Sequence, residues 1–435
     1  MWYKLKIWLH NPSENLWLTP ALGAIFAIFF SLFATASRYF IPEDAVPNIT
    51  IETLSSLLDI IASSMLAVTT FSLSIMVAAF ASASSSGTPR AYQLMMSDDN
   101  TRMAISSFIS AFIYAVIAKI ALGLEYYGPA GRFVLFISTI LVLMYLIYTL
   151  IRWVQTLSQL GTLGNTIAKI ELAAGKTLAE FRHQPHYGAT GQIPESTPAF
   201  IIYSPKTGYL NHFNIEGLEQ LAVDHQLHLH LPHCVGKFLD PKTVIIEVHT
   251  EQSLSNTLQQ QLKNTILDQI IIEPNRSFLQ DPRFGVLVMT EVAQKAMSAA
   301  INDVGSAISS INALTRILID SQPEPDATTL DCPHMSITLF NQQDLIYSTY
   351  MPLVRDCGAN LELNQRLLKC LSMIEQNVAE TELKQAAQVT AEYLLQRSLN
   401  QFDFVPDQQL LQRQFAEYFP NSHLATTKNK IDTAT

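Results

Sequence analysis

Four long runs without a charged residue dominate the N-terminal third of the chain. They cover residues 16–37, 60–89, 103–118 and 133–151, and the third resumes after Lys119. A helix needs ~20 apolar residues to cross the ~30 Å hydrocarbon core of a bilayer. Helices are favoured because lipid cannot satisfy an open backbone. The sequence therefore predicts four transmembrane helices, at about residues 16–40, 52–82, 102–124 and 132–152.

The rest of the chain has the composition of a soluble protein, so we expect a membrane protein with a four-helix transmembrane block followed by an α+β cytoplasmic domain. Strand candidates with β-branched residues are 200–203, 227–231, 243–248 and 270–272. The expected parts are an interfacial segment (1–15), a transmembrane domain (16–151), a helical connector and linker (152–199), a small β-rich module (200–250), a mainly helical soluble domain (251–422) and a disordered tail (423–435).

Lysine and arginine near the predicted helix ends indicate the orientation. One side carries the larger set, Lys4, Lys6, Arg90, Arg102, Arg152, Lys169 and Lys176, while the other carries Arg38 and Arg132, with Lys119 near it. Positive charge accumulates on the cytoplasmic side. We therefore expect a multi-pass protein of the cell membrane, in contact with lipid, with both termini in the cytoplasm.

The net charge of −10 argues against nucleic-acid binding, which needs a basic surface to neutralise phosphates. The four cysteines, Cys234, Cys332, Cys357 and Cys370, contain no CxxC pair. Two disulfides are one reading, but a chain of this size in a reducing compartment favours buried free thiols.

The second predicted helix carries a stripe of polar residues. Ser55, Ser56, Asp59, Ser63, Thr70 and Ser74 fall within an arc of about 100° at 100° per residue. Such hydroxyls often pack helices together within membranes, and this interpretation is favoured. The alternative is a water-accessible ion pathway along Asp59, Ser63, Thr70 and Ser74, because an acid inside a membrane indicates a functional site.

Asp59 and Lys119 are candidates for an ion pair within the membrane. Asp59 lies about 12 Å and Lys119 about 8 Å from the same predicted membrane surface, at 1.5 Å per helical residue. These depths are compatible with a direct contact.

The predicted β-rich module contains a histidine cluster, His225, His228, His230 and His233, followed by Cys234. Side chains alternate along a strand, so His228 and His230 share one face. They are weak candidates for a transition-metal site; the favoured interpretation is the polar face of a solvated strand, with no metal.

Two polar segments of the soluble part are candidates for a ligand site or an interface. They contain Gln280, Asp281 and Arg283 in one and Asn302 and Asp303 in the other. If the segments met, two carboxylates could do acid–base chemistry. Asp and Asn also favour helix caps and turns, and the chain has no P-loop, HExxH or GxGxxG motif. An enzyme is therefore the less favoured reading, and no cofactor is expected.

Several segments resemble a bacterial family of predicted membrane proteins, domain of unknown function 2254. They are Ser82–Arg90, Gly208-Tyr209-Leu210, Gly236–Leu239, Gln280–Gly285 and Ala296–Asp303. Ala299-Ala300 stands where the family has Pro-Gly, which weakens the prediction of a tight turn before Asn302. The resemblance spans nearly the whole chain. It implies a bacterial inner-membrane protein and assigns no activity.

These features lead to two main functional expectations. The first is a homo-oligomeric ion channel or transporter-like protein, regulated by its cytoplasmic domain, because four helices leave little room for a pathway inside one subunit. The second is a membrane-anchored sensor or scaffold whose soluble domain binds a small ligand or a protein. A membrane-bound enzyme is the third choice.

Overall fold

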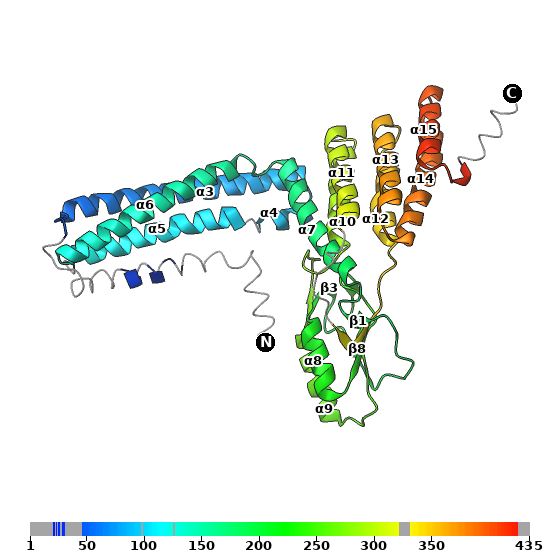
Figure 1. The fold of residues 1–435 in the computed structure, drawn as a ribbon, viewed down its shortest axis with the longest axis horizontal. Coiled ribbons are helices and arrows are strands. Elements are labelled where there is room, and N and C mark those ends of the chain that lie inside the picture. The colour runs from blue at the N-terminus through cyan, green and yellow to red at the C-terminus, as the bar shows by residue number, and fades with distance from the viewer. Residues whose placement is uncertain are drawn as a thin grey trace. The chain divides into compact units, whose positions relative to one another are not determined.

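The computed structural model describes residues 21, 23, 25, 26, 28–30, 46–96, 99–124, 127–321 and 331–424 (Figure 1). The chain divides into two compact units. The N-terminal unit lies within residues 6–166, and the C-terminal unit is formed mainly by residues 167–435.

Four helices of the N-terminal unit are α3 (Ile51–Ser86), α4 (Pro89–Met96), α5 (Asp99–Gly123) and α6 (Pro129–Leu157). Three stretches, Ile51–Ser82, Thr101–Gly123 and Pro129–Leu157, are long and apolar enough to cross a membrane. The fourth expected span, residues 16–40, lies largely outside the described residues, as does the segment 1–15. Three of the predicted spans are therefore helices that could cross a membrane by length and composition, and the count of four is not confirmed.

Helices α3, α5 and α6 pack through a mixed large-and-small interface. Leu54, Leu58 and Ile61 of α3 are buried with Ala111 and Ala115 of α5, because small residues let membrane helices approach closely. Large apolar side chains point outward instead. They include Ile60, Leu66, Phe71, Leu141, Ile147 and Ile151. An apolar outer surface of this kind suits contact with lipid.

Between α5 and α6, the buried Tyr114 hydroxyl hydrogen-bonds Ser138 Oγ at 2.7 Å and Thr139 Oγ1 at 3.2 Å. Such interhelical hydrogen bonds contribute on the order of 0.6 kcal/mol each within a membrane. They add specificity to an interface that is otherwise apolar.

The connector helix α7 (Leu163–His183) is held to the C-terminal unit along one face. Glu171 accepts two hydrogen bonds from Arg316, at 2.6 Å and 2.7 Å. Thr177 donates to the Phe278 carbonyl at 2.9 Å. The half-buried Arg182 donates to the Leu318 carbonyl at 2.7 Å and pairs with Glu380 at 2.8 Å. The second half of α7 is therefore a structural part of that unit.

Two sheets form the β-rich part of the C-terminal unit. The five-stranded sheet has the order β1-β8-β4-β6-β2, and the three-stranded sheet has the order β5-β3-β7. Their strands are β1 (Ala189–Thr190), β2 (Phe200–Tyr203), β3 (Gly208–Phe213), β4 (His228–Leu231), β5 (Phe238–Leu239), β6 (Val244–His249), β7 (Ile270–Glu273) and β8 (Cys332–Ile337). The four predicted strands are confirmed, but β1, β7 and β8 lie outside residues 200–250.

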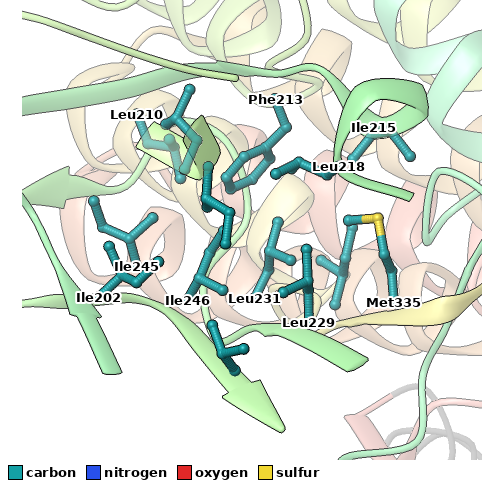
Figure 2. Packing of buried hydrophobic residues seen from close by; sticks show 14 of the residues in the cluster. Ile202, Leu210, Phe213, Ile215, Leu218, Leu229, Leu231, Ile245, Ile246 and Met335 are labelled. Carbon is teal, nitrogen blue, oxygen red and sulfur yellow. The ribbon is translucent and has the colours of Figure 1, made fainter. Parts of the chain in front are cut away.

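One face of the five-stranded sheet forms the main β core. Leu229, Leu231 and Met335 are fully buried there with Leu218 of helix α8 (Ile215–His225), and Figure 2 shows them gathered with Phe213. Asn214 caps α8 by accepting a hydrogen bond from Gly217. Helix α9 (Asn256–Asp268) begins at a Ser255 cap and adds its own apolar residues to this core.

Among the described residues, six further helices belong to the C-terminal unit: α10 (Phe284–Met297), α11 (Val304–Asp320), α12 (Asp344–Asp356), α13 (Leu361–Asn377), α14 (Thr381–Gln401) and α15 (Val405–Tyr418). Helix α10 packs against α11 and α12, and α13 packs against α11 and α14. The four cysteines are buried and free, which confirms the prediction of free thiols. Burial raises the pKa of Cys234 to about 11 and that of Cys357 to about 12, so both stay protonated near neutral pH.

The turn between α6 and α7 depends on a glycine. Gly161 has φ +77°, and an added Cβ would lie 3.0 Å from the Ala79 carbonyl oxygen of α3. Ser82 Oγ also donates to the Gly161 carbonyl at 3.3 Å. We expect Gly161→Ala to cost about 1–3 kcal/mol, because a left-handed backbone strains an alanine. The measurement is thermal unfolding of the purified protein in detergent.

The control for this substitution is Gly164→Ala, in the first turn of α7, where an added Cβ meets nothing within 4 Å. It should leave stability unchanged or raise it by up to ~1 kcal/mol, because alanine favours helices. Equal melting temperatures for the two variants would contradict the role given to Gly161.

Candidate functional site

The polar stripe of α3 lies on the helix face opposite the packing face. At 100° per residue, Leu54, Leu58, Ile61 and Met65 point to one side, and all four are buried. The stripe points the other way. Asp59, Ser63, Thr70 and Ser74 are exposed, as is Ser56, while Ser55 is half-buried. The stripe is therefore not what packs α3 against α5 and α6.

The hydroxyls of the stripe share one hydrogen-bond arrangement. Ser63 Oγ donates to the Asp59 carbonyl at 2.7 Å, and Ser74 Oγ donates to the Thr70 carbonyl at 3.0 Å. Thr70 Oγ1 donates to the Leu66 carbonyl at 2.9 Å. A hydroxyl has one hydrogen and two lone pairs. With its hydrogen given to its own helix, each hydroxyl presents an acceptor oxygen outward.

The structure pairs Asp59 with Lys119, as their depths in the sequence predicted. Lys119 Nζ of α5 contacts Asp59 Oδ1 of α3. The side chains remain 55% and 46% exposed respectively, so the pair also lies on the outer surface of the helices. A charge pair facing hydrocarbon is costly. The pair would therefore be stabilised by water, or by a polar surface of another chain, beside Asp59 and Lys119.

The Gln280–Gly285 segment forms a buried latch in the C-terminal unit. The Asp281 side chain is 1% exposed and receives 2.8 Å and 2.6 Å contacts from Nε and Nη2 of Arg276. The Arg283 amide donates to its other oxygen at 3.1 Å. Burial raises the pKa of Asp281, and Arg276 opposes this effect by stabilising the carboxylate. An Asp so enclosed has no room for a substrate.

A glycine makes room for this pair. Gly236 has φ +89°, and an added Cβ would lie 2.2 Å from Asp281 Oδ2 and 2.8 Å from Arg276 Nη2. The neighbouring Val235 carbonyl accepts a hydrogen bond from Arg283 at 3.3 Å. The motif segments around Gly236 and Asp281 therefore lie in contact. The glycine is needed because the Asp281–Arg276 pair occupies the space of its missing side chain.

Gln280 and Arg283 bind backbone and aromatic groups. Gln280 Oε1 accepts from the Phe213 amide at 2.9 Å, and its carbonyl accepts from the Tyr187 hydroxyl at 3.1 Å. The Arg283 guanidinium lies 4.6 Å from the centre of the Phe340 ring. These contacts tie three separate parts of the C-terminal unit together, so they indicate a structural role.

Asn302 and Asp303 lie at the opposite end of α10 from this latch. Asp303 caps α11 by accepting from the Ser306 amide at 3.0 Å. The hydrogen bond from the Ser306 hydroxyl at 2.6 Å, followed by that amide, lowers the pKa of Asp303. Asn302 has φ +47° and its amide bonds the Ser298 carbonyl, so a tight turn forms despite Ala299-Ala300. Helix α10 has 14 residues, or about 21 Å, between the segments. The two segments therefore do not form one catalytic cluster.

His228 and His230 share a face of β4, as the alternation predicted. His228 Nε2 and His230 Nδ1 both hydrogen-bond Ser336 Oγ of β8, at 3.1 Å and 2.8 Å. Among the described residues, no group of three or more His, Cys, Asp or Glu side chains is arranged to hold a metal ion. His230 is nevertheless buried, so this face is not simply a solvated one.

Sequence reasoning missed several partners of these residues. Arg276 and Gly236 complete the Asp281 site, and His249, His334 and Ser336 extend the histidine face. The signal for Arg276 was its position only five residues before Asp281. The partners of His228 come from strands β6 and β8, which sequence spacing alone does not bring together.

The family model described as "Predicted membrane protein (DUF2254)" matches residues 13–373 of the chain. Comparisons with curated proteins and with solved structures gave no match.

The latch predicts a large penalty when its buried charge loses its partner. We expect Arg276→Met to destabilise the C-terminal unit by about 3–5 kcal/mol, because Asp281 is left buried and uncompensated. Arg355→Met is the control: Arg355 and Asp356 form an exposed pair, which should contribute less than ~1 kcal/mol. Denaturant unfolding of the two variants measures the difference.

The pH dependence gives a second readout. The raised pKa of Asp281 means that protonation favours the folded state, and removing Arg276 removes the group that lowers this pKa. The loss of stability caused by Arg276→Met should therefore become smaller as the pH falls into the range where carboxyl groups are protonated. It should become larger as the pH rises. A penalty that is independent of pH would contradict the burial of a charged Asp281.

Proposed function

The chain belongs to the DUF2254 family of predicted membrane proteins, and from that premise we propose that it is a homo-oligomeric, cation-conducting protein of the bacterial inner membrane. In this proposal both termini lie in the cytoplasm, and the C-terminal unit regulates conduction. The observation that carries the proposal is the outward acceptor stripe of α3.

The chemistry of the stripe favours a cation. Asp59 offers carboxylate oxygens, and Ser63, Thr70 and Ser74 offer hydroxyl oxygens whose hydrogens are already bound to the helix backbone. Oxygen acceptors replace the hydration shell of a metal cation, whereas an anion needs donors. Conduction of alkali cations therefore fits this surface better than conduction of anions.

The position of the stripe supports a pathway between subunits. Its residues face away from α5 and α6, so these two helices do not enclose them. Several copies arranged around an axis would bring their α3 helices together and keep the Asp59–Lys119 pair away from lipid. Closed cyclic symmetry is common among homo-oligomers of soluble proteins.

Lys119 acts in this proposal as a barrier. Its ammonium neutralises Asp59 and places a positive charge beside the pathway. A cation then passes Asp59 and Lys119 only if its attraction to the carboxylate is stronger than its repulsion by the ammonium. Lys119 thus sets how readily cations enter.

Regulation by the C-terminal unit is supported by the attachment of α7. Only residues 158–162 separate the end of α6 from the start of α7, and Arg316 and Glu380 hold α7 to the C-terminal unit. A change in that unit would therefore act on a helix that continues directly from a membrane span.

The second candidate function is a membrane-anchored sensor or scaffold. It is favoured by a cavity of about 1120 Å³ in the C-terminal unit, lined by residues 188–190 and 192–195 together with His228, Asp331 and Pro333. The space is large enough for a small ligand. In this case the polar stripe would be dispensable, which separates the two candidates.

Ion flux in liposomes tests the proposal. Wild-type protein should pass K⁺ or Na⁺, and Thr70→Leu should reduce the flux at least about tenfold, because it replaces an acceptor oxygen with an apolar group. Asp59→Asn should also reduce it by removing the carboxylate charge. The control is Phe71→Leu, at an exposed apolar position beside Thr70 but off the stripe.

No flux of common ions from a folded, assembled protein would overturn the channel proposal and favour the sensor. Equal loss with Phe71→Leu would also count against it, because the effect would then reflect general damage to α3.

Substitution of the lysine separates a pathway from a packing surface. We expect Lys119→Met to raise cation flux several-fold, because the unneutralised Asp59 carboxylate then attracts cations. If the stripe only packs helices, the same substitution leaves an unpaired acid and lowers the stability of the protein without creating or raising flux. Flux and thermal stability are measured on the same preparation.

A further inference from the structure

The second face of the five-stranded sheet carries two cross-strand rows of polar side chains. In the first row, His228 of β4 lies between its register partner His249 of β6 and His334 of β8. In the second row, His230 lies between Glu247 and Ser336. The imidazoles of His228, His230 and His249 thus lie on one side of β4 and β6, opposite the apolar core, and His334 of β8 lies near them.

Three of these imidazoles, those of His228, His230 and His249, contact serine hydroxyls. His230 is 3% and His249 is 5% exposed. Ser336 Oγ serves both His228 and His230, and Ser196 Oγ lies 3.1 Å from His249 Nδ1. The other ring nitrogen of His249, Nε2, is buried without a hydrogen-bond partner in the described part of the chain.

Four carboxylates lie beside these imidazoles. Glu219 of α8 binds His334 Nδ1 at 2.7 Å, and Glu247 lies 3.8 Å from His249 Nε2. Glu195 and Asp331 line the adjoining cavity beside His228. Adjacent strands are about 4.8 Å apart, so protonated rings in one row would repel each other strongly.

We propose that this histidine face is a proton sensor, and that acidification releases the segment of residues 191–197 that lies over it. The proton is the ligand, and the four imidazoles with Ser196 and Ser336 are its site. The proposal concerns the C-terminal unit alone and does not depend on ion conduction.

Residues 191–197 are the part of the structure suited to move. They lie between β1 and β2 outside any strand, and most of them are exposed. Ser196 contacts His249, and the same segment borders the cavity beside His228. Its departure would give His228 and His249 access to water without breaking the sheet.

The direction of the response follows from linkage. Burial, followed by the neighbouring histidines, lowers the pKa of His228, and burial also lowers that of His230. A group with a lowered pKa stabilises the closed arrangement above its ordinary value of ~6.5, and this stabilisation is lost as the pH falls below it. Each such histidine can favour the open arrangement by up to about tenfold per pH unit below ~6.5.

Hydrogen exchange on the full-length protein in detergent tests the proposal at pH 7.5 and pH 5.5, with rates corrected for intrinsic exchange. Residues 191–197 should exchange about tenfold faster at pH 5.5, by the same linkage. Residues 210–213 of β3 are the internal reference, because global unfolding would expose them too. The double variant His228→Gln, His249→Gln should lose the response, whereas His225→Gln, at the end of α8, should keep it.

Ser196→Ala provides a variant that leaves every imidazole in place. It should speed exchange of residues 191–197 at pH 7.5, because it removes the contact with His249. Wild-type exchange that is the same at both pH values would overturn the proposal without reference to any variant. So would a full acid response in a folded double variant.

Discussion

Hydrocarbon cannot solvate charge, and the N-terminal unit is organised around that constraint. The spans of α3, α5 and α6 present large apolar side chains outward and use small residues where they meet. The exception is the Asp59–Lys119 pair with its line of hydroxyls on the outside of α3. Because α3, α5 and α6 pack without this stripe, its polarity needs an explanation outside the packing of these three helices.

The C-terminal unit depends on a buried charge in a comparable way. Asp281 is compensated by Arg276, and Gly236 leaves the space that the pair occupies. Gln280 and Arg283 extend the same site to β3 and to the ring of Phe340. A buried pair contributes little net stability, but losing one partner is costly. Such a site therefore enforces one arrangement of the segments that meet there.

Local patterns in the sequence predicted the spans, the stripe, the Asp59–Lys119 contact and four strands, because all of these follow from charge-free runs or simple periodicity. Strand β8 was not predictable. It pairs in parallel with β1 and β4, which are distant in sequence, and Pro333 argues against a central strand. Asp281 suggested a cap or an acid–base group because its partners are brought together only by the tertiary fold. Predictions for residues 1–15 and 425–435 lie outside the described residues.

The second face of the five-stranded sheet is built mainly from histidine and serine, with Glu247 as an acid among them. Its strands are too enclosed to leave a permanent charge solvated, since His230 and His249 are both buried. A fully apolar face would instead have resembled the core face of the sheet. It would have held residues 191–197 by hydrophobic contacts at every pH. Neutral imidazole lies between these extremes: it hydrogen-bonds serine hydroxyls as a polar group, and burial lowers the pKa of His228 and His230, so these two rings gain charge only at acidic pH. The covering segment is therefore held by contacts whose strength depends on protonation.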